Sequence, residues 1–397
     1  MREKLHLPKV STRTLVLWLI ASSGMVFLLV FRLLKSTGSL YSPGEIMAHH
    51  HAQSWHTLYD NPLELPYTFF VWLGATIGHH SVLLNRVVAI MFAFVAAWLF
   101  YYILTNWISR RIAILATILF VASNGYLHAA RLGTAAVLQF GVLLLMALPI
   151  LITNAPNASR RKLFYLSAAI GSALLYVPGM IWQLLLTAAM RRKKLFRILS
   201  RLSPLQKVAT GLASIVVATP LVWAMYRTPR LLLDFAGLPH QMPSSEQIVS
   251  NATTFASTLF YHSGFSPEYV THGSALVSAG ELLLFALGLY ALAKPPRHAT
   301  SYFMLGSLVV SSILVILGSQ VFLVALIPII YLVIAWGMYY FLDEWLTVFP
   351  RNPIARRLGV TLLCAVLASC VLFHLRSYFV AWPHNSVTRK VYNQRQP

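Results

Sequence analysis

Glu45 is the first residue whose type and surroundings point to chemistry, because an acid held at the start of a helix can act as a general base. It follows the sequence Tyr41–Gly44, in which a serine precedes a proline, and it opens a segment rich in histidine. These features are typical of a helix start. At helical spacing Glu45, His49 and His56 share one face. The pattern predicts a general base polarised by His49, or a His49 that contacts an anionic leaving group; a solvated amphipathic helix with a capping glutamate is the alternative.

Few other carboxylates are available, because the chain has only ten Asp and Glu residues. In the topology derived below, Glu281 lies about one turn inside a membrane span, where an acid is by default a functional candidate. It could equally be the internal partner of Arg86 or Arg131. The other acids expected on the outer side are Glu45, Asp60, Glu64, Asp234, Glu246 and Glu268.

Two arginines are expected in apolar surroundings on the same side. Arg86 lies near the start of a predicted span, and Arg131 lies in a predicted tight turn at residues 129–132. A buried charge without a partner is costly, so each arginine requires an anion. A protein carboxylate such as Glu45 or Asp60 would serve, and so would a lipid phosphate, which matches the planar guanidinium.

Histidines are frequent in the first polar loop and raise the question of a metal site. Glu45 and His49 have the spacing of two ligands on one helix face, but no motif such as HExxH is present. Consecutive histidines on a helix point in different directions. We therefore favour histidines at the membrane interface over a metal site. The residues concerned are His49, His50, His51, His56, His79 and His80.

The composition defines the scaffold that must position these residues. Of the 397 residues 58% are apolar and 10% are charged, against about 25% charged in soluble domains, which excludes a soluble globular enzyme. The net charge of +21 requires that nucleic acid be considered as a partner. The basic runs lie in short loops and at helix ends, where membrane topology and anionic lipid account for them. Cys364 and Cys370 share one apolar run and form neither a disulfide framework nor a metal pair.

Eleven apolar segments predict an all-α, polytopic membrane protein, since about 20 helical residues cross a bilayer core of about 30 Å. Residues Phe164–Met190 are divided into two helices at Tyr176–Gly179, because basic runs flank both ends and such runs favour the cytoplasmic side. This hairpin places the N-terminus in the cytoplasm and the C-terminus outside. The predicted segments are 14–34, 82–105, 112–128, 133–153, 163–176, 180–190, 208–225, 276–294, 300–318, 321–342 and 358–376.

Two long polar loops remain on the outer side, at residues 35–81 and 226–275. Loops of this length are usually functional or disordered, and apolar stretches within them, such as Pro66–Ile77, predict helices that lie on the membrane. We predict two modules. Residues 1–205 form a catalytic transmembrane module with the first loop, and residues 206–397 form a C-terminal transmembrane module with the second loop and a short outer tail.

Several short motifs follow one another in a characteristic order. Gly44-Glu45 precedes a Pro-rich segment at Asn61–Tyr67, and Leu84–Ala89 and Leu127–Gly133 come next. In this order they resemble the Asp-Glu loop motif, the "hPPlyy" segment, the "lRlpsal" helix start and the "ySReaR.y" motif of the polyprenyl-phosphate-sugar-dependent membrane glycosyltransferases of the GT-C class. The nearest subgroup is the protein mannosyltransferase or aminoarabinose transferase-like one. The resemblance continues at Tyr176–Gly179, Leu283–Leu292, Phe349–Pro353 and Tyr378–Trp382.

The resemblance implies a GT-C-like fold and an inverting sugar transfer. Glu45 would take the proton of an acceptor hydroxyl or amine, which attacks the anomeric carbon of a sugar on a polyprenyl phosphate. Arg86, Arg131, His128 and His49 would bind the donor phosphate and stabilise its developing charge. The resemblance implies no required cofactor; a divalent metal, which some relatives use, is optional.

One position departs from the family pattern. The residue before the glutamate is usually an aspartate, and here it is Gly44, which leaves one carboxylate where two are common. Asp60, at the far end of the same loop, is expected to compensate as a second catalytic carboxylate. Loss of activity is the alternative.

The resulting hypothesis is an enzyme of the bacterial inner membrane whose active site faces outward. Its partners would be a polyprenyl-phosphate sugar donor, a glycan, lipid or protein acceptor and membrane lipids, but no nucleic acid. A transporter or flippase of lipid-linked substrates is the rival, although polar residues concentrated on one face favour an enzyme over alternating access. Gly44 keeps a third possibility open, a non-catalytic scaffold in envelope assembly.

Overall fold

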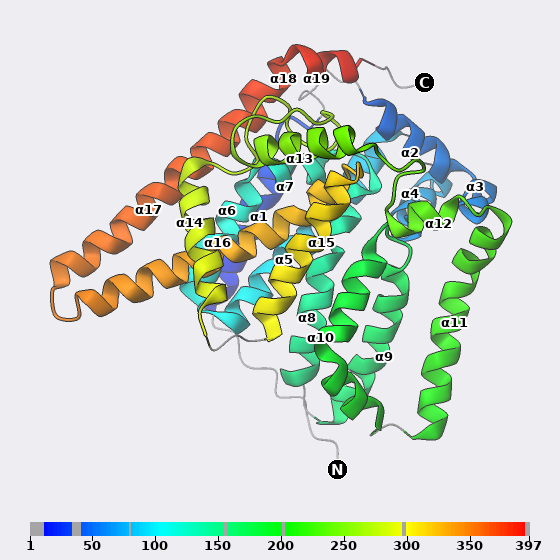
Figure 1. Ribbon diagram of the computed structural model, residues 1–397, viewed down its shortest axis with the longest axis horizontal. Helices are drawn as coiled ribbons and strands as arrows, with labels where there is room; N and C mark the ends of the chain where they lie inside the picture. Colours follow the sequence, from blue (N-terminus) through cyan, green and yellow to red (C-terminus); the bar gives the residue numbers. More distant parts are fainter. Residues whose placement is uncertain are drawn as a thin grey trace.

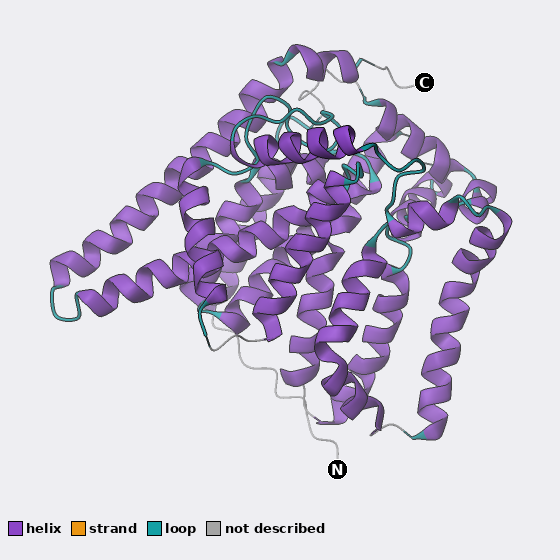
Figure 2. Cartoon of the chain, viewed as in Figure 1, coloured by secondary structure: helices purple, strands orange, loops and turns teal. Residues whose placement is uncertain are grey.

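The computed structural model describes residues 12–33, 41–78, 81–154, 157–200, 203–295 and 299–393, and no strand occurs among them (Figure 2). The helices of the first half are α1 (Thr12–Val30), α2 (Pro43–Gln53), α3 (Trp55–Asp60), α4 (Leu65–Thr76), α5 (Val82–Trp107), α6 (Arg110–Ala122), α7 (Asn124–Arg131), η1 (Ala135–Gly141), α8 (Val142–Asn154), α9 (Asn157–Leu174) and α10 (Met180–Ser200).

The second half is also helical and ends in a run of helical turns that is interrupted only at Asn385 within the described residues. Its helices are α11 (Pro204–Arg227), α12 (Leu231–Ala236), α13 (Ser245–Phe260), α14 (Ala279–Ala293), α15 (Ala299–Ile316), α16 (Phe322–Val348), α17 (Pro353–Arg376), η2 (Ser377–Ala381), α18 (Trp382–His384) and α19 (Ser386–Val391).

The apolar helices confirm a polytopic α-helical membrane protein. Within the described residues, five helices are long and apolar enough to cross a membrane, and α6 with α7 makes a sixth if that bent pair is one span. Four further apolar helices of 10–17 described residues are present. The number of eleven spans stays a prediction.

The break predicted at Tyr176–Gly179 is present. Helix α9 ends at Leu174 and α10 begins at Met180. Gly179 between them has φ of +68°, in the left-handed region that favours glycine. A Cβ at this position would lie 2.0 Å from Cζ of Phe322 on α16. The turn thus needs glycine both for its backbone and for its close approach to α16.

The tight turn predicted at residues 129–132 is wrong. Helix α7 runs through Arg131, because the chain bends by 60° between α6 and α7 instead. Ser123 lies at this bend and caps α7 through its side chain, which accepts a hydrogen bond from the backbone N–H of Tyr126. An N-terminal cap that supplies its own acceptor can begin a new helix immediately after the previous one ends. The bend carries His128 and Arg131 into the interior on one short helix.

Helix α16 forms the centre of the molecule and joins the two halves of the chain. Its Tyr331 packs against Phe120 of α6, with ring centroids 5.8 Å apart, and both rings belong to one large buried cluster. On its other side α16 lies against α14 at very short range. A Cβ on Gly337 would lie 1.8 Å from the carbonyl oxygen of Leu284, and one on Gly288 would lie 2.0 Å from that of Val333. The two glycines let the backbones of α14 and α16 touch.

We expect Gly337→Ala to destabilise the protein by about 3 kcal/mol or more, because the added methyl group meets backbone and cannot be accommodated by a rotamer change. The measurement is thermal unfolding of the purified protein in detergent. The matched control is Gly211→Ala on α11, where no atom lies within 4 Å of the new Cβ. Equal effects of the two substitutions would contradict this packing.

The short helices gather at one end of the bundle. Figure 1 shows α2, α3, α4, α12, α13, α18 and α19 at its upper end, with α8 to α11 running beneath them. The stretch predicted as a surface helix, Pro66–Ile77, is α4. The two polar loops and the C-terminal helices therefore meet over the same end of the bundle, where the candidate site lies. The division into modules at residues 205 and 206 stays a prediction.

Candidate active site

Glu45 and Arg86 form a buried ion pair that joins α2 to α5. Nε of Arg86 donates to Oε1 of Glu45 at 2.7 Å, and Nη2 donates to Oε2 at 3.0 Å. The Glu45 side chain is fully buried, and that of Arg86 is 3% exposed. The third guanidinium nitrogen of Arg86, Nη1, donates to the carbonyl of Leu33 at 3.1 Å. Such a two-point contact fixes both the distance and the orientation of the pair.

The local sequence explains how Glu45 is held. Ser42 caps α2 and forms a capping box, in which its side chain accepts from the Glu45 N–H while its own N–H donates to Oε2 of Glu45. The N–H of Gly133 donates to Oε1 at 3.0 Å. Glu45 thus accepts four hydrogen bonds, two from Arg86 and two from backbone. This geometry suits an anchor, since both oxygens are already occupied by donors.

His49 lies one turn further along α2 and is linked to the residues around the ion pair through Asn85. It is buried, and its Nδ1 lies 3.4 Å from Oδ1 of Asn85, whose Nδ2 donates to the carbonyl of Gly133. His56 does not share this face as predicted, because α2 ends at Gln53 and His56 is an exposed residue of α3. The separation of α2 from α3 at Ser54 turns the second helix away.

Arg131 is the second buried cation, with a side chain 3% exposed at the end of α7. Nη2 donates to the carbonyl of Phe31 at 2.7 Å, and the guanidinium lies 5.1 Å and 5.0 Å from the ring centroids of Tyr378 and Phe379. Its Nε and Nη1 are buried and have no hydrogen-bond partner among the described residues. Buried polar atoms are nearly always satisfied, so these two donors indicate a place for an anion.

His128 and Tyr378 connect the surroundings of Arg131 with the Glu45–Arg86 ion pair. The buried ring of His128 meets the edge of Trp382 at 5.2 Å between centroids, and Tyr378 stacks on Trp382 at 5.3 Å. Tyr378 is also within electrostatic reach of Arg131, Arg86 and Glu45. Four of the predicted donor-site residues, Arg86, Arg131, His128 and His49, are therefore brought to one region.

The other two predicted residues lie apart. Asp60 is exposed at the end of α3, and its carboxylate makes no hydrogen bond to any described residue. Glu281 lies in the first turn of α14 in a separate buried cluster, where it accepts hydrogen bonds from Tyr331 and Ser278 and pairs with Nε2 of His374 at 2.7 Å. Its partner is thus His374, and neither Arg86 nor Arg131. This cluster ties α14, α16 and α17 together.

Sequence reasoning named Glu268 and Glu64 among the outer acids but gave neither a role. Glu268, from the second polar loop, places Oε1 2.9 Å from the N–H of Gly44, which donates to it. Glu64 precedes α4 in the left-handed conformation, with φ of +64°, and its N–H donates to the carbonyl of Tyr176 at 2.7 Å. The unusual backbone of Glu64 and the tertiary origin of the Glu268 contact have no signature in the sequence.

Burial raises the pKa of the Glu64 carboxyl to about 7, from 4.5. The folded state therefore binds this proton more tightly than the unfolded chain, and stability falls as pH rises from about 4.5 to about 7. We expect Glu64→Gln to unfold at a higher temperature than the wild type at pH 8, by up to about 3 kcal/mol in stability, and at the same temperature at pH 4. Thermal unfolding at the two pH values measures this. The exposed Glu246→Gln is the control, and the same shift at both pH values would contradict the assignment.

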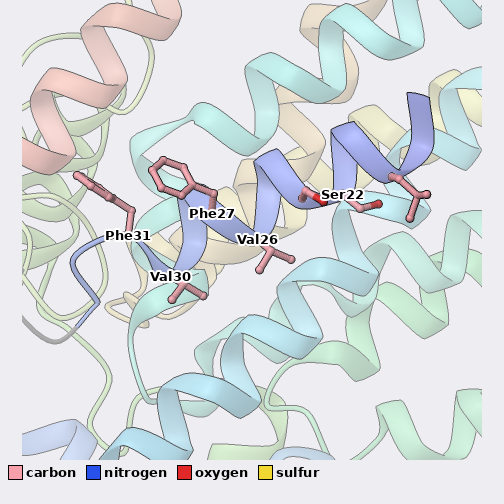
Figure 3. A pocket seen from close by; sticks show the side chains of 7 residues that line it. Ser22, Val26, Phe27, Val30 and Phe31 are labelled. Atoms are coloured by element: carbon pink, nitrogen blue, oxygen red, sulfur yellow. The ribbon is translucent and has the colours of Figure 1, made fainter. Parts of the chain in front are cut away.

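An apolar stripe leads along α1 to Arg131. It lines a recess of about 580 Å³, and Figure 3 shows several of these side chains projecting into it. Its last residue, Phe31, accepts the hydrogen bond from Arg131 and contacts the ring of Phe379, with centroids 5.7 Å apart. The Arg131 guanidinium thus meets this apolar surface at its Phe31 end, through Nη2. The lining residues are Leu19, Ser22, Ser23, Val26, Phe27, Val30 and Phe31.

No group of three or more His, Cys, Asp or Glu side chains arranged to hold a metal ion occurs among the residues that the structure describes. Of the histidines considered for a metal, His79 and His80 lie outside those residues. Glu45 and His49, the pair with ligand spacing, instead contact Arg86 and Asn85.

Comparison with known proteins relates this architecture to solved membrane proteins. No protein-family model and no curated protein matches the sequence. In structure, the chain is similar to ArnT from Cupriavidus metallidurans in the apo state, with a TM-score of 0.62, 12% identity and coverage of 96% of this chain and 78% of that one. It is also similar to the same protein bound to undecaprenyl phosphate, with a TM-score of 0.57, 13% identity and coverage of 96% and 77%. These likenesses show that the chain has the GT-C membrane fold expected from its motifs.

Proposed function

We propose that this chain is a membrane glycosyltransferase that takes a sugar from a polyprenyl phosphate. Its fold is that of ArnT, a GT-C aminoarabinose transferase, and one of the similar structures holds undecaprenyl phosphate. The likeness supports the fold, and the residues of the site must carry the function. The proposal therefore depends on whether this chain offers a place for a lipid phosphate.

The single observation that carries the proposal is Arg131. A guanidinium buried with two unpaired N–H groups is costly in the absence of a ligand. A phosphate oxygen pair matches the fork geometry of arginine and would satisfy both donors. Helix α7 and the rings of Tyr378 and Phe379 hold the guanidinium in place, which orients it for an anion that reaches it.

The protein offers an apolar surface for the polyprenyl chain next to Arg131. The α1 stripe from Leu19 to Phe31 ends where the Phe31 carbonyl accepts from Arg131. A lipid whose phosphate binds Arg131 would place its tail along this stripe, inside the membrane, where it buries apolar surface. One ligand then accounts for both the unpaired donors and the exposed apolar face.

During sugar transfer, negative charge develops on the donor phosphate. An acceptor oxygen or nitrogen attacks the anomeric carbon, its proton goes to a carboxylate, and the bond from that carbon to the phosphate oxygen breaks with inversion. The departing phosphate gains negative charge. Arg131, with Arg86 held in orientation by Glu45 nearby, stabilises that charge more in the transition state than in the ground state.

We place the reaction on the outer face of a bacterial inner membrane, with the N-terminus in the cytoplasm. The support is the distribution of Lys and Arg and the gathering of α2 to α4, α13 and the C-terminal helices at one end (Figure 1). The acceptor would be a glycan, lipid or protein. We expect no required cofactor, and a divalent ion stays an option for this site.

Donor turnover tests the function. Purified protein in detergent is mixed with a bacterial lipid extract that contains undecaprenyl-phosphate-linked sugars and acceptors, and mass spectrometry follows the release of free undecaprenyl phosphate. We expect the wild type to release it and heat-inactivated protein not to. No release by folded wild type from extracts of several bacterial envelopes would contradict the proposed function.

A further inference from the structure

We infer that Glu268, carried by the loop between α13 and α14, is the carboxylate that takes the acceptor proton. This inference rests on the proposed function and names the residue that the mechanism left open. Six carboxylates lie on the polar elements at this end of the bundle. Asp234 on α12 pairs with His240 at 3.2 Å and Glu246 on α13 is exposed, and neither makes a hydrogen bond to α2 within the described residues. The other four are Glu45, Asp60, Glu64 and Glu268. Their hydrogen bonds and exposure decide which of them can accept a proton.

Glu45 is unsuited to accept a proton. Its two oxygens accept four hydrogen bonds, and its side chain is fully buried. Protonation would break a two-point ion pair and leave the charge of Arg86 buried without its partner. Glu45 is therefore a positioning residue for Arg86 and for the start of α2.

Glu268 has the opposite character. Oε1 is held by the N–H of Gly44, whereas Oε2 accepts no hydrogen bond from any described residue, and the side chain is partly exposed. A carboxylate fixed at one oxygen and open at the other is pre-oriented toward an incoming hydroxyl. It lies directly beside the first turn of α2, next to the Glu45–Arg86 pair.

The glycine at position 44 makes room for this carboxylate. A Cβ on Gly44 would lie 3.0 Å from Oε1 of Glu268, 3.5 Å from its Cδ and 3.6 Å from Oε2. The Glu268 carboxylate thus occupies the volume that a side chain at position 44 would fill. Since Gly44 has no left-handed φ, its lack of a side chain is explained by this contact and not by its backbone.

The loop that carries Glu268 is fastened at the two residues that precede it. The N–H of Ser266 donates to Oε1 of Gln320 at 3.1 Å, and the Tyr392 hydroxyl donates to the carbonyl of Pro267 at 3.5 Å. The backbone of Pro267 and Glu268 also lies beside the His128 ring. The carboxylate is therefore positioned by the turn before α16, by the end of α19 and by α7, the helix that bears Arg131.

Asp60 and Glu64 are less suitable. Asp60 is exposed and makes no hydrogen bond to the described site residues. Glu64 is held beside the α9–α10 turn through its N–H bond to Tyr176. Neither contacts Gly44 or the Glu45–Arg86 pair, which leaves Glu268 as the carboxylate held at the first turn of α2.

The first test removes the Glu268 carboxylate. In the undecaprenyl-phosphate release assay, Glu268→Ala and Glu268→Gln are expected to lower turnover about 10²–10⁴-fold, the range for loss of a general base. Binding of undecaprenyl phosphate, measured by native mass spectrometry, is expected to change less than about threefold, since Arg131 is untouched. Glu64→Gln, the matched control, keeps turnover within about threefold.

A compensating variant separates catalysis from folding. Gly44→Asp in the Glu268→Ala background restores a carboxylate to the same volume from the α2 side, where an acid in the first turn favours the helix. We expect this double variant to turn over at least about tenfold faster than Glu268→Ala alone, whereas Gly44→Asn in the same background gives no increase. Gly44→Asp alone is expected to lower turnover, because two carboxylates then compete for one place.

The outcomes distinguish this inference from the function beneath it. Turnover that stays at the wild-type level in Glu268→Gln would overturn the role of Glu268 and leave the proposed function standing, whatever the effect of Glu64→Gln. Equal loss of turnover and of undecaprenyl phosphate binding in Glu268→Gln would also overturn it, since a purely structural role would have that result. A folded wild type without binding or turnover would overturn both.

Discussion

Arg131→Ala is expected to weaken binding of undecaprenyl phosphate about 100-fold or more. Two charge-assisted hydrogen bonds from Nε and Nη1 are lost, and each such bond contributes about 1.5–3 kcal/mol. Arg131→Lys should recover only part of the affinity, because an ammonium keeps the charge without the planar fork. Native mass spectrometry with added undecaprenyl phosphate gives the affinities directly.

The stability of the same variant provides a second readout. Without ligand, the Arg131 guanidinium is a buried charge with two unpaired donors, which costs free energy, while it gains one hydrogen bond to Phe31 and two ring contacts. We expect these contributions to offset, so that Arg131→Ala changes the free energy of unfolding by less than about 1 kcal/mol.

Arg227→Ala is the matched control for Arg131→Ala. Arg227 also lies over two aromatic rings, those of Tyr59 and Trp223, but it is exposed at the end of α11. Its removal should leave undecaprenyl phosphate affinity within about twofold. Equal losses in the two variants would mean that the phosphate is attracted by general positive charge, and would contradict a specific site at Arg131.

Loss of the Glu45–Arg86 pair has the largest expected effect on stability. Glu45→Ala leaves a buried guanidinium without its carboxylate, and Arg86→Ala leaves a buried carboxylate without its cation. Breaking a buried pair in this way costs about 3–5 kcal/mol. Thermal unfolding in detergent should therefore show a strongly lowered midpoint for either variant.

The double variant separates an ion pair from two independent contributions. If the pair acts as a unit, Glu45→Ala with Arg86→Ala should cost clearly less than the sum of the single changes. The matched control is the exposed pair of Lys294 and Glu344, at 3.4 Å, whose removal should cost less than about 1 kcal/mol. Additive effects of the two buried substitutions would show that the contact contributes little.

The parts of the structure that follow from local rules were predictable. The helix start at Ser42 to Glu45, the surface helix α4 and the break between α9 and α10 each have a residue pattern with a physical cause within a few positions. The motif order also predicted the fold shared with ArnT. Local chemistry and motif order were sufficient here because neither requires knowledge of which distant segments meet.

The parts that depend on tertiary contact were not predictable. The resemblance left a missing carboxylate at Gly44, and Asp60 was the nearest candidate in the chain; the structure instead brings Glu268, more than 200 residues away, to that place. Likewise, Arg131 was assigned to a turn because the bend at Ser123 has no strong breaker such as proline. Only the packed helices show which side chains are satisfied and which donors remain open.

A structure of the wild-type protein with undecaprenyl phosphate, determined by cryo-electron microscopy, tests the central claim most directly. We expect phosphate oxygens within hydrogen-bond distance of Nε and Nη1 of Arg131, and the prenyl chain along the α1 stripe that ends at Phe31. A phosphate bound elsewhere on the protein, with the two Arg131 donors still unpaired, would contradict it.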